Sequence, residues 1–135
     1  MPPTIVIRGW SLISWIHSTG LEGTGRAIFL KDLEGLDWAD GVVAIMDGPD
    51  PDSGTAWECG YAYARRIPVV LFRSDLRASS GVPDIPYNAM LIGAADAHIV
   101  LPLATLDDAA RAILAALGAL PPSSSGRTAP SSSGA

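Results

Sequence analysis

The chain has 135 residues, 48% of them hydrophobic, and a mean hydropathy of +0.28, which is enough to bury the core of one domain. Fourteen Asp and Glu residues outnumber nine Lys and Arg residues, so the net charge is −5. The basic residues are scattered and form no face suited to a phosphate backbone or an anionic membrane surface. We therefore expect no nucleic-acid partner and no membrane partner.

Residues 4–8 are rich in β-branched side chains and end at Gly9, which predicts a first strand. Residues 11–17 suit either a short helix or an irregular segment. Between Arg26 and Ala39, apolar residues recur at helical spacing with charged residues between them, which predicts an amphipathic helix. The short apolar run over 41–46 predicts a buried strand.

A helix is predicted from about Thr55 to Arg66, and a further strand over 68–72. With the strand over 41–46 they form one βαβ unit, so we expect parallel strands joined by a right-handed crossover. The loop before the helix lies at the carboxyl end of a buried strand, where open α/β sheets usually bind ligands.

Residues 74–95 are rich in Gly and Pro, and a last strand is predicted over 97–101. A capping box at Thr105 opens a helix that ends near Leu120. We expect one domain over residues 1–120, a doubly wound, flavodoxin-like α/β fold with a parallel sheet. Residues 121–135 repeat Pro, Ser and Gly, and we expect a disordered tail.

The positions of cysteine and histidine limit the disulfides and metal sites that the chain can form, and the hydropathy pattern limits membrane spans. The single cysteine, Cys59, excludes an internal disulfide and suits a small buried thiol. His17 and His98 lie far apart with no Cys or carboxylate at ligand spacing, so we expect no metal and no cofactor. The apolar stretch over 5–16 is interrupted by Arg8, and no run reaches the length of a membrane span. The expected location is the cytoplasm.

Four carboxylates crowd the loop and helix that follow the strand over 41–46: Asp47, Asp50, Asp52 and Glu58. Their mutual repulsion would be costly without a ligand to organise them. This segment is therefore the candidate site.

Each candidate residue also has a purely structural interpretation. Thr55 and Glu58 have the spacing of a capping box, although a glutamate in the first helical turn is also kept ionised, which suits a nucleophile. Asp52 suits a helix N-cap, Asp32 an exposed helix charge, and Asn88 a turn residue. The residues alone leave both interpretations open.

Two acidic residues outside the central segment have structural interpretations only. Asp37 suits an exposed charge on the predicted helix over 26–39. Asp75 and Arg77 suit a surface ion pair, which would contribute little to stability.

Five segments stand in a characteristic order along the chain. They are Asp40-Gly-Val-Val-Ala-Ile-Met-Asp-Gly48, Asp52-Ser-Gly-Thr-Ala-Trp-Glu-Cys-Gly-Tyr-Ala62, Pro68-Val-Val70, Asp75-Leu-Arg77 and Asn88-Ala-Met90. The series resembles the nucleoside 2-deoxyribosyltransferase family, and the second segment carries most of the resemblance. It covers roughly residues 28–90, about half of the chain.

The resemblance implies a reaction. Glu58 corresponds to the family nucleophile, which attacks the anomeric carbon of a 2′-deoxynucleoside, releases the base and forms a deoxyribosyl ester. A free nucleobase then attacks the ester, so the enzyme transfers 2-deoxyribose between bases in nucleoside salvage. Asp52 corresponds to the acid that helps to protonate the departing base.

The resemblance also implies the substrate-binding residues. Asp32 corresponds to a second carboxylate that contacts the base, and Gly54 belongs to the substrate-binding set. Asn88 and Met90 correspond to residues that reach the sugar in the site of a neighbouring subunit. A homo-oligomer is therefore expected, with 2′-deoxynucleosides and free nucleobases as ligands.

The chain departs from the family pattern before its first predicted helix. Members usually begin with a strand-helix-strand unit whose first strand presents an aromatic hydroxyl near the nucleophile. Here about two dozen residues precede Arg26, and Val6 or Ile7 stands where a tyrosine is expected, so we expect a fold shortened at the N-terminus. Glu58 would then lack an orienting hydrogen bond, and water would compete for the ester.

This departure keeps two alternatives open. One is an N-glycosidase that hydrolyses 2′-deoxynucleosides or their 5′-monophosphates with the same glutamate. The other is a non-catalytic nucleoside-binding module.

Overall fold

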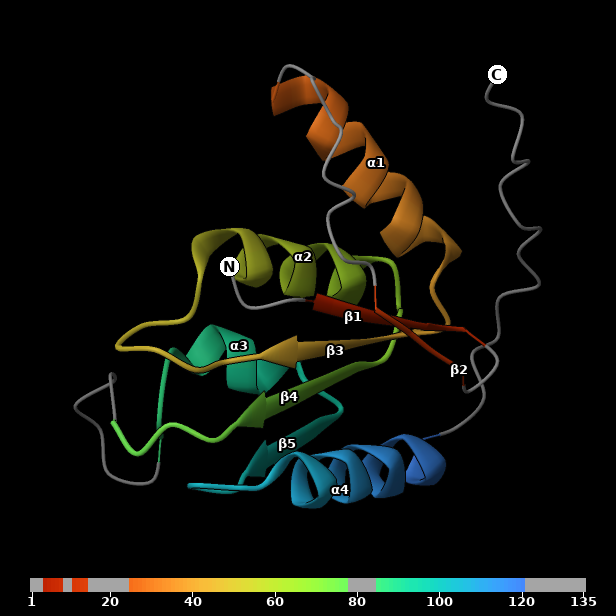
Figure 1. Ribbon diagram of the computed structural model, residues 1–135. Coiled ribbons are helices and arrows are strands. Elements are labelled where there is room, and N and C mark those ends of the chain that lie inside the picture. Colours follow the sequence, from red (N-terminus) through yellow and green to blue (C-terminus); the bar gives the residue numbers. More distant parts are fainter. Residues whose placement is uncertain (1–3, 9–10, 15–24, 78–84, 121–135) are drawn as a thin grey trace.

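A computed structural model of the chain describes residues 4–8, 11–14, 25–77 and 85–120 (Figure 1). In the described residues, five strands form one sheet in the order β2-β1-β3-β4-β5, and helices cover both faces. The elements are β1 (Thr4–Arg8), β2 (Ser11–Ser14), α1 (Gly25–Trp38), β3 (Gly41–Ile45), α2 (Ser53–Ala64), β4 (Val69–Arg73), α3 (Ala89–Ala94), β5 (Ala97–Val100) and α4 (Leu106–Ala119).

Three parallel strands confirm the predicted α/β, flavodoxin-like fold class. β3 pairs with β4 in the register Val43 to Val70, and β4 pairs with β5 in the register Phe72 to Ile99. Helix α2 connects the first pair, and the predicted capping box of α4 at Thr105 is present. α2 begins and ends two residues earlier than the predicted helix over 55–66.

The two N-terminal strands differ from the expectation of a sheet that is parallel throughout. β1 runs antiparallel to both β3 and β2, and β2 occupies part of the segment that suited a helix or irregular chain. Arg8 pairs with Ser11, so the connection is too short for the crossover that parallel neighbours need. In β2, two adjacent apolar residues lie between serines, so the segment lacks the alternation of apolar and polar residues that predicts a strand.

Alternate side chains of the central strands enter two cores. Figure 1 shows α2 above the sheet and α4 below it. Val42 and Ala44 join the core beneath α1, α2 and α3, whereas Val43 joins the core against α4. Because both faces of β3 and β4 are buried, these strands read as continuous apolar runs.

Some of the predicted features belong to residues that the structure does not describe. His17 and the tail over 121–135 lie outside the described residues, and so do the side chains of Val6 and Ile7. Within the described part of the chain, no helix combines the length and apolar character that crossing a bilayer requires.

Leu71 tests the core under α2. Its side chain has no exposed surface at the centre of β4, so Leu71→Ala leaves a cavity and should lower the free energy of unfolding by about 2–5 kcal/mol. Leu114→Ala, at a residue 58% exposed on α4, is the matched control and should change it by less than about 1 kcal/mol. Urea titration measures both, and equal losses would contradict the assigned core.

Candidate functional site

The candidate segment begins with a cap at the N-terminus of α2. Asp52 is the N-cap, and its Oδ2 accepts hydrogen bonds from the Thr55 amide at 3.0 Å and the Thr55 hydroxyl at 3.4 Å. The structural interpretation of Asp52 is therefore confirmed, and the predicted capping box of Thr55 with Glu58 is wrong. Because α2 begins at Ser53, Thr55 lies in the first turn and Glu58 in the second.

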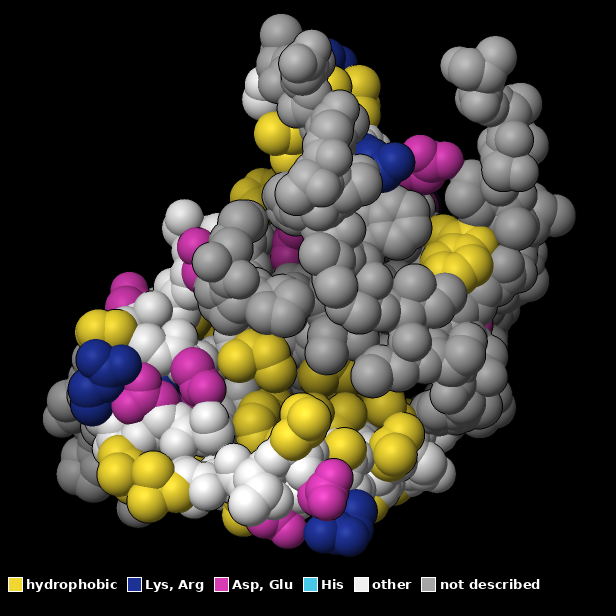
Figure 2. Space-filling model, in the orientation of Figure 1, with side chains coloured by type: hydrophobic (Ala, Val, Ile, Leu, Met, Phe, Trp, Pro, Cys, Tyr) yellow, Lys and Arg dark blue, Asp and Glu magenta, His cyan; other side chains and the backbone are white. Residues whose placement is uncertain are grey.

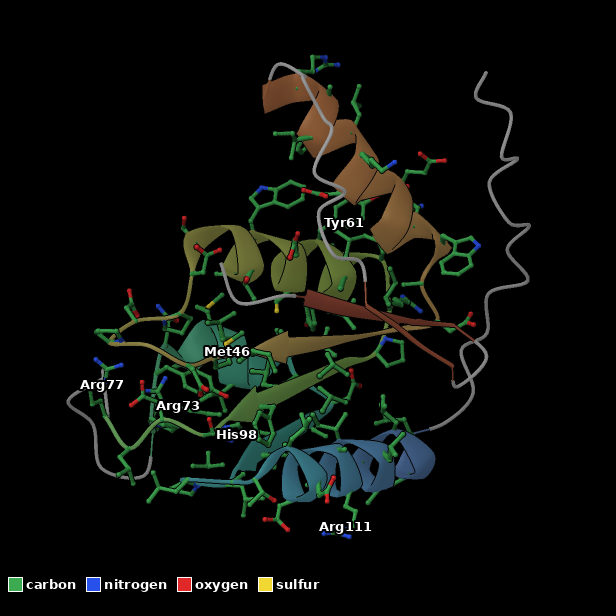
Figure 3. All side chains as sticks on the ribbon, viewed as in Figure 1. Met46, Tyr61, Arg73, Arg77, His98 and Arg111 are labelled. Carbon is green, nitrogen blue, oxygen red and sulfur yellow. The ribbon has the colours of Figure 1, made fainter. Side chains whose placement is uncertain are left out.

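Glu58 is half-buried on the flank of α2 that turns toward α1. Gly54, Glu58 and Tyr61 share a helical face because they are four and three residues apart. The Tyr61 hydroxyl donates to Asp37 Oδ1 on α1 at 2.7 Å, which fixes the direction of that face (Figure 3).

Aromatic rings and one ion pair join α1 to α2 beside Glu58. Phe29 meets Trp57 edge to face at 5.5 Å between centroids, and Trp57 stacks on Tyr61 at 5.6 Å. Arg65 lies 3.0 Å from Asp37. Asp37 is thus half-buried and paired, not the exposed helix charge that was expected.

Asp32 lies on the face of α1 that is directed to α2. It is one turn from Phe29, which contacts α2, and one turn from the buried Leu36. Its side chain is half-buried, which differs from the expected exposed helix charge. Asp32 and Glu58 therefore come from facing sides of the two helices.

Asn88 and Met90 lie on the other side of α2. Asn88 is the N-cap of α3, where its Oδ1 accepts from the Met90 amide at 2.8 Å, and the Met90 side chain is 81% exposed. They line a groove of about 590 Å³ between α2 and α3, whose wall includes Ser53 and Gly60. Helical periodicity places Ser53 and Gly60 on a side of α2 that faces well away from Glu58. Within one chain, Asn88 and Met90 therefore do not reach the glutamate.

The acidic loop is held by donors within the protein. Asp47 accepts from the Ser74 amide at 2.7 Å, the Ser74 hydroxyl at 2.6 Å and the Asp75 amide at 3.0 Å. Asp75 in turn accepts from the Gly48 amide at 2.9 Å. The expectation that these carboxylates need a ligand to offset their repulsion is therefore wrong for Asp47 and for the capping Asp52.

Asp75 and Arg77 form the ion pair that was expected at the surface, and several hydrogen bonds of Arg77 reinforce it. Arg77 donates to Asp75 through its guanidinium, with Nη2 at 2.6 Å, and through its amide at 2.9 Å. These hydrogen bonds hold the pKa of the Asp75 carboxyl well below its usual range. Figure 2 shows positive and negative side chains together at this end of the molecule.

Arg73 is a residue that the sequence reasoning missed. It ends β4 with no exposed surface and donates to backbone carbonyls of the two neighbouring loops. The one signal in the sequence was a basic residue that closes an apolar strand.

Cys59 is fully buried, as expected of a small thiol packed in the core. Burial, and then the negative charge of the adjacent Glu58, raise the pKa of Cys59 to about 12. Among the described residues, no three His, Cys, Asp or Glu side chains gather in a way that would hold a metal ion.

Comparison with known proteins agrees with the five segments. Residues 17–90, more than half of the chain, match the family model described as nucleoside 2-deoxyribosyltransferase. Among solved structures, a conserved protein from Enterococcus faecalis is similar with a TM-score of 0.52 and 24% identity over 72% of each chain. At that identity the likeness supports the fold alone. No curated protein matches the chain.

The thiol of Cys59 should make stability depend on alkaline pH. Its pKa is raised from 9.0 to about 12, so the folded chain holds a proton that the unfolded chain loses first. The stability due to the neutral thiol is present below pH 9.0 and is lost as pH rises toward about 12.

Urea unfolding of wild type and Cys59→Ala across that range measures the effect, because other titrating groups cancel in the difference. We expect wild type to lose stability relative to the variant as pH rises. A difference that stays constant with pH would contradict the assignment.

Proposed function

Since residues 17–90 match its family model, the chain belongs to the nucleoside 2-deoxyribosyltransferase family, and we propose that it transfers 2-deoxyribose between nucleobases. Family membership itself supports deoxyribosyl transfer or a related activity on nucleosides. The observation that carries the finer proposal is Glu58, a half-buried carboxylate between α1 and α2 that faces the side of α1 bearing Asp32.

In the proposed first step, Glu58 acts as the nucleophile. A carboxylate oxygen bonds to C1′ of the deoxynucleoside, the C1′ to nitrogen bond breaks, and its electron pair leaves with the base. The transition state resembles an oxocarbenium ion, so the anionic carboxylate stabilises the positive charge that develops at C1′. Partial burial of Glu58 keeps part of the bulk water from the resulting ester.

The departing base needs a proton, and Asp52 is the proposed donor. Its Oδ2 is engaged with Thr55, which fixes the carboxyl group while Oδ1 is directed elsewhere. Asp32, on the facing helix, is the proposed second contact to the base. General acid assistance of this kind typically contributes 10²–10⁴-fold to a rate.

In the second step, a nitrogen of the incoming base attacks C1′ of the ester and gives up its proton to the carboxyl group that served as acid. The bond from C1′ to the Glu58 oxygen breaks, and the carboxylate is restored. Two displacements at one carbon retain its configuration.

A neighbouring subunit is proposed to complete the sugar site. Asn88 uses its Oδ1 to cap α3, so its Nδ2 remains a donor for a sugar oxygen, and Met90 extends beside it with most of its surface exposed. Both lie across α2 from Glu58 of the same chain. Contact with a second copy would bring them to that copy's glutamate.

Transfer is tested by incubating the protein with deoxyinosine and adenine and separating the products by chromatography. We expect deoxyadenosine and hypoxanthine from wild type. Glu58→Gln should lower the rate by at least about 10³-fold, because the amide is a poor nucleophile. Glu34→Gln, at an exposed glutamate on α1, is the matched control and should retain the activity.

The other products separate the alternatives. Hypoxanthine with free deoxyribose and no deoxyadenosine would indicate an N-glycosidase. Nucleoside binding without either product would indicate a binding module, and equal activity of Glu58→Gln and wild type would exclude the proposed nucleophile.

Shared sites are tested by mixing two inactive variants. In a mixed dimer of Glu58→Gln and Asn88→Ala subunits, one of the two sites combines an intact Glu58 with an intact Asn88. With random pairing, about a quarter of wild-type activity should return. Each variant alone is the control, and a mixture no more active than its components would contradict sharing of sites between subunits.

A further inference from the structure

Arg73 lies at the carboxyl edge of the sheet, where β3 and β4 end. It has no exposed surface, and its guanidinium donates to the carbonyls of Met46, Gly48 and Arg77, with Nη2 at 3.0 Å from the Gly48 oxygen (Figure 3). One side chain thus holds the loop after β3 and the loop after β4 together.

Arg73 is a buried charge whose partners, within the described residues, are carbonyl groups and the ring of Tyr87, 5.7 Å from the guanidinium carbon. No carboxylate within the same residues forms an ion pair with it. Burying a charge is costly, and well-packed apolar residues in place of a buried ion often stabilise a protein equally well. The specific effect of Arg73 is therefore on the positions of the two loops that it joins.

Two of the three carbonyls that Arg73 binds, those of Met46 and Gly48, lie on either side of Asp47. Asp47 reaches in the opposite direction and accepts from Ser74 and from the Asp75 amide. Hydrogen bonds therefore run from the β4 side to carbonyls of residues 46–48 and to the carboxylate between them. Within this stretch, Gly48 has a φ of +109°. Four residues after Gly48, Asp52 caps α2, so the loop that Arg73 holds leads directly to the cap.

We propose that Arg73 is a positioning residue for the Asp52 carboxyl group, which it aims through the loop over 46–52. This inference rests on the proposed function, in which Asp52 gives a proton to the departing base. The planar guanidinium can serve three carbonyls in different directions, whereas the ammonium of a lysine is a single point charge. Replacing Arg73 by Lys keeps the charge and removes the fork.

The test compares nucleosides whose base must be protonated in order to leave with nucleosides whose base leaves with less need of a proton. 7-Methyl-2′-deoxyinosine releases a neutral base without protonation, whereas deoxyinosine does not. Arg73→Lys should lower the rate of base release from deoxyinosine by about 10²-fold and from the methylated nucleoside by less than about threefold. 2′-Deoxyuridine and 5-fluoro-2′-deoxyuridine form the corresponding pyrimidine pair.

A loss shared equally by both nucleosides, or no loss with either, would overturn the inference, because a merely structural arginine does not discriminate between leaving groups. Arg111→Lys, on the exposed side of α4, is the matched control and should change neither rate. If Arg73→Lys does not fold, Ser74→Ala removes the 2.6 Å hydrogen bond to Asp47 and should shift the ratio in the same direction by about threefold.

Amide hydrogen exchange separates this inference from the proposed reaction. In Arg73→Lys, the amides of Ser74 and Thr55, which are bonded to Asp47 and Asp52, should exchange at least about tenfold faster, while that of Ile113 in α4 stays unchanged. If wild type cleaves no nucleoside, the proposed function fails, and hydrogen exchange alone decides whether Arg73 has the inferred role. Unchanged exchange at Ser74 and Thr55 would then overturn the role of Arg73.

Discussion

The parallel pairing of β3 with β4 determines where the candidate site lies. Parallel neighbours need a crossover, and α2 supplies it, so the chain must leave β3 at the carboxyl edge of the sheet before α2 begins. The loop over 46–52 therefore passes the end of β4 on its way to α2. The hydrogen bonds of Asp47 and Arg73 across this edge follow from the same topology.

Helix α2 divides its residues among three environments. Thr55, Cys59 and Ala62 are buried against the sheet, which fixes the rotation of the helix about its axis. Once that rotation is fixed, Glu58 turns toward α1 and Gly60 turns toward α3. The separation of Glu58 from the groove at α3 is thus a consequence of core packing, and it is the geometry expected if each chain lends one flank of α2 to a different site.

Much of the fold was predictable because local patterns carried it. Continuous apolar runs gave β3 and β4, and helical periodicity gave α1, since both reflect burial that acts on single residues. The antiparallel direction of β1 was not predictable, because β-branched composition favours a strand in either direction. The start of α2 was misplaced because Asp52, followed by Ser and Gly, competed with Thr55 for the cap.

The resemblance supplied the candidate residues, whose roles stay predictions, and the structure supplied their arrangement. The order of the acidic segments indicated Glu58 and Asp52 before any geometry was known. Arg73 was not identified, because a basic residue that closes an apolar strand looks the same in sequence whether it binds distant carbonyls or lies at the surface. The partners of Asp47 and Asp37 were equally hidden, since Ser74 lies 27 residues from Asp47 and Tyr61 lies 24 residues from Asp37.

The hydrogen bonds of Arg73 and Arg77 also bear on whether a substrate with a phosphate group would fit. At the carboxyl edge of β3 and β4, the two arginines that the structure describes are both engaged, Arg73 with backbone carbonyls and Arg77 with Asp75. A phosphate entering there would have to displace the bidentate hydrogen bonds of Arg77 and would meet Asp47 and Asp52. A neutral nucleoside meets no such cost, because carboxylates accept hydrogen bonds from its hydroxyl and amino groups. For the proposed reaction, this distribution of charge supports an unphosphorylated substrate.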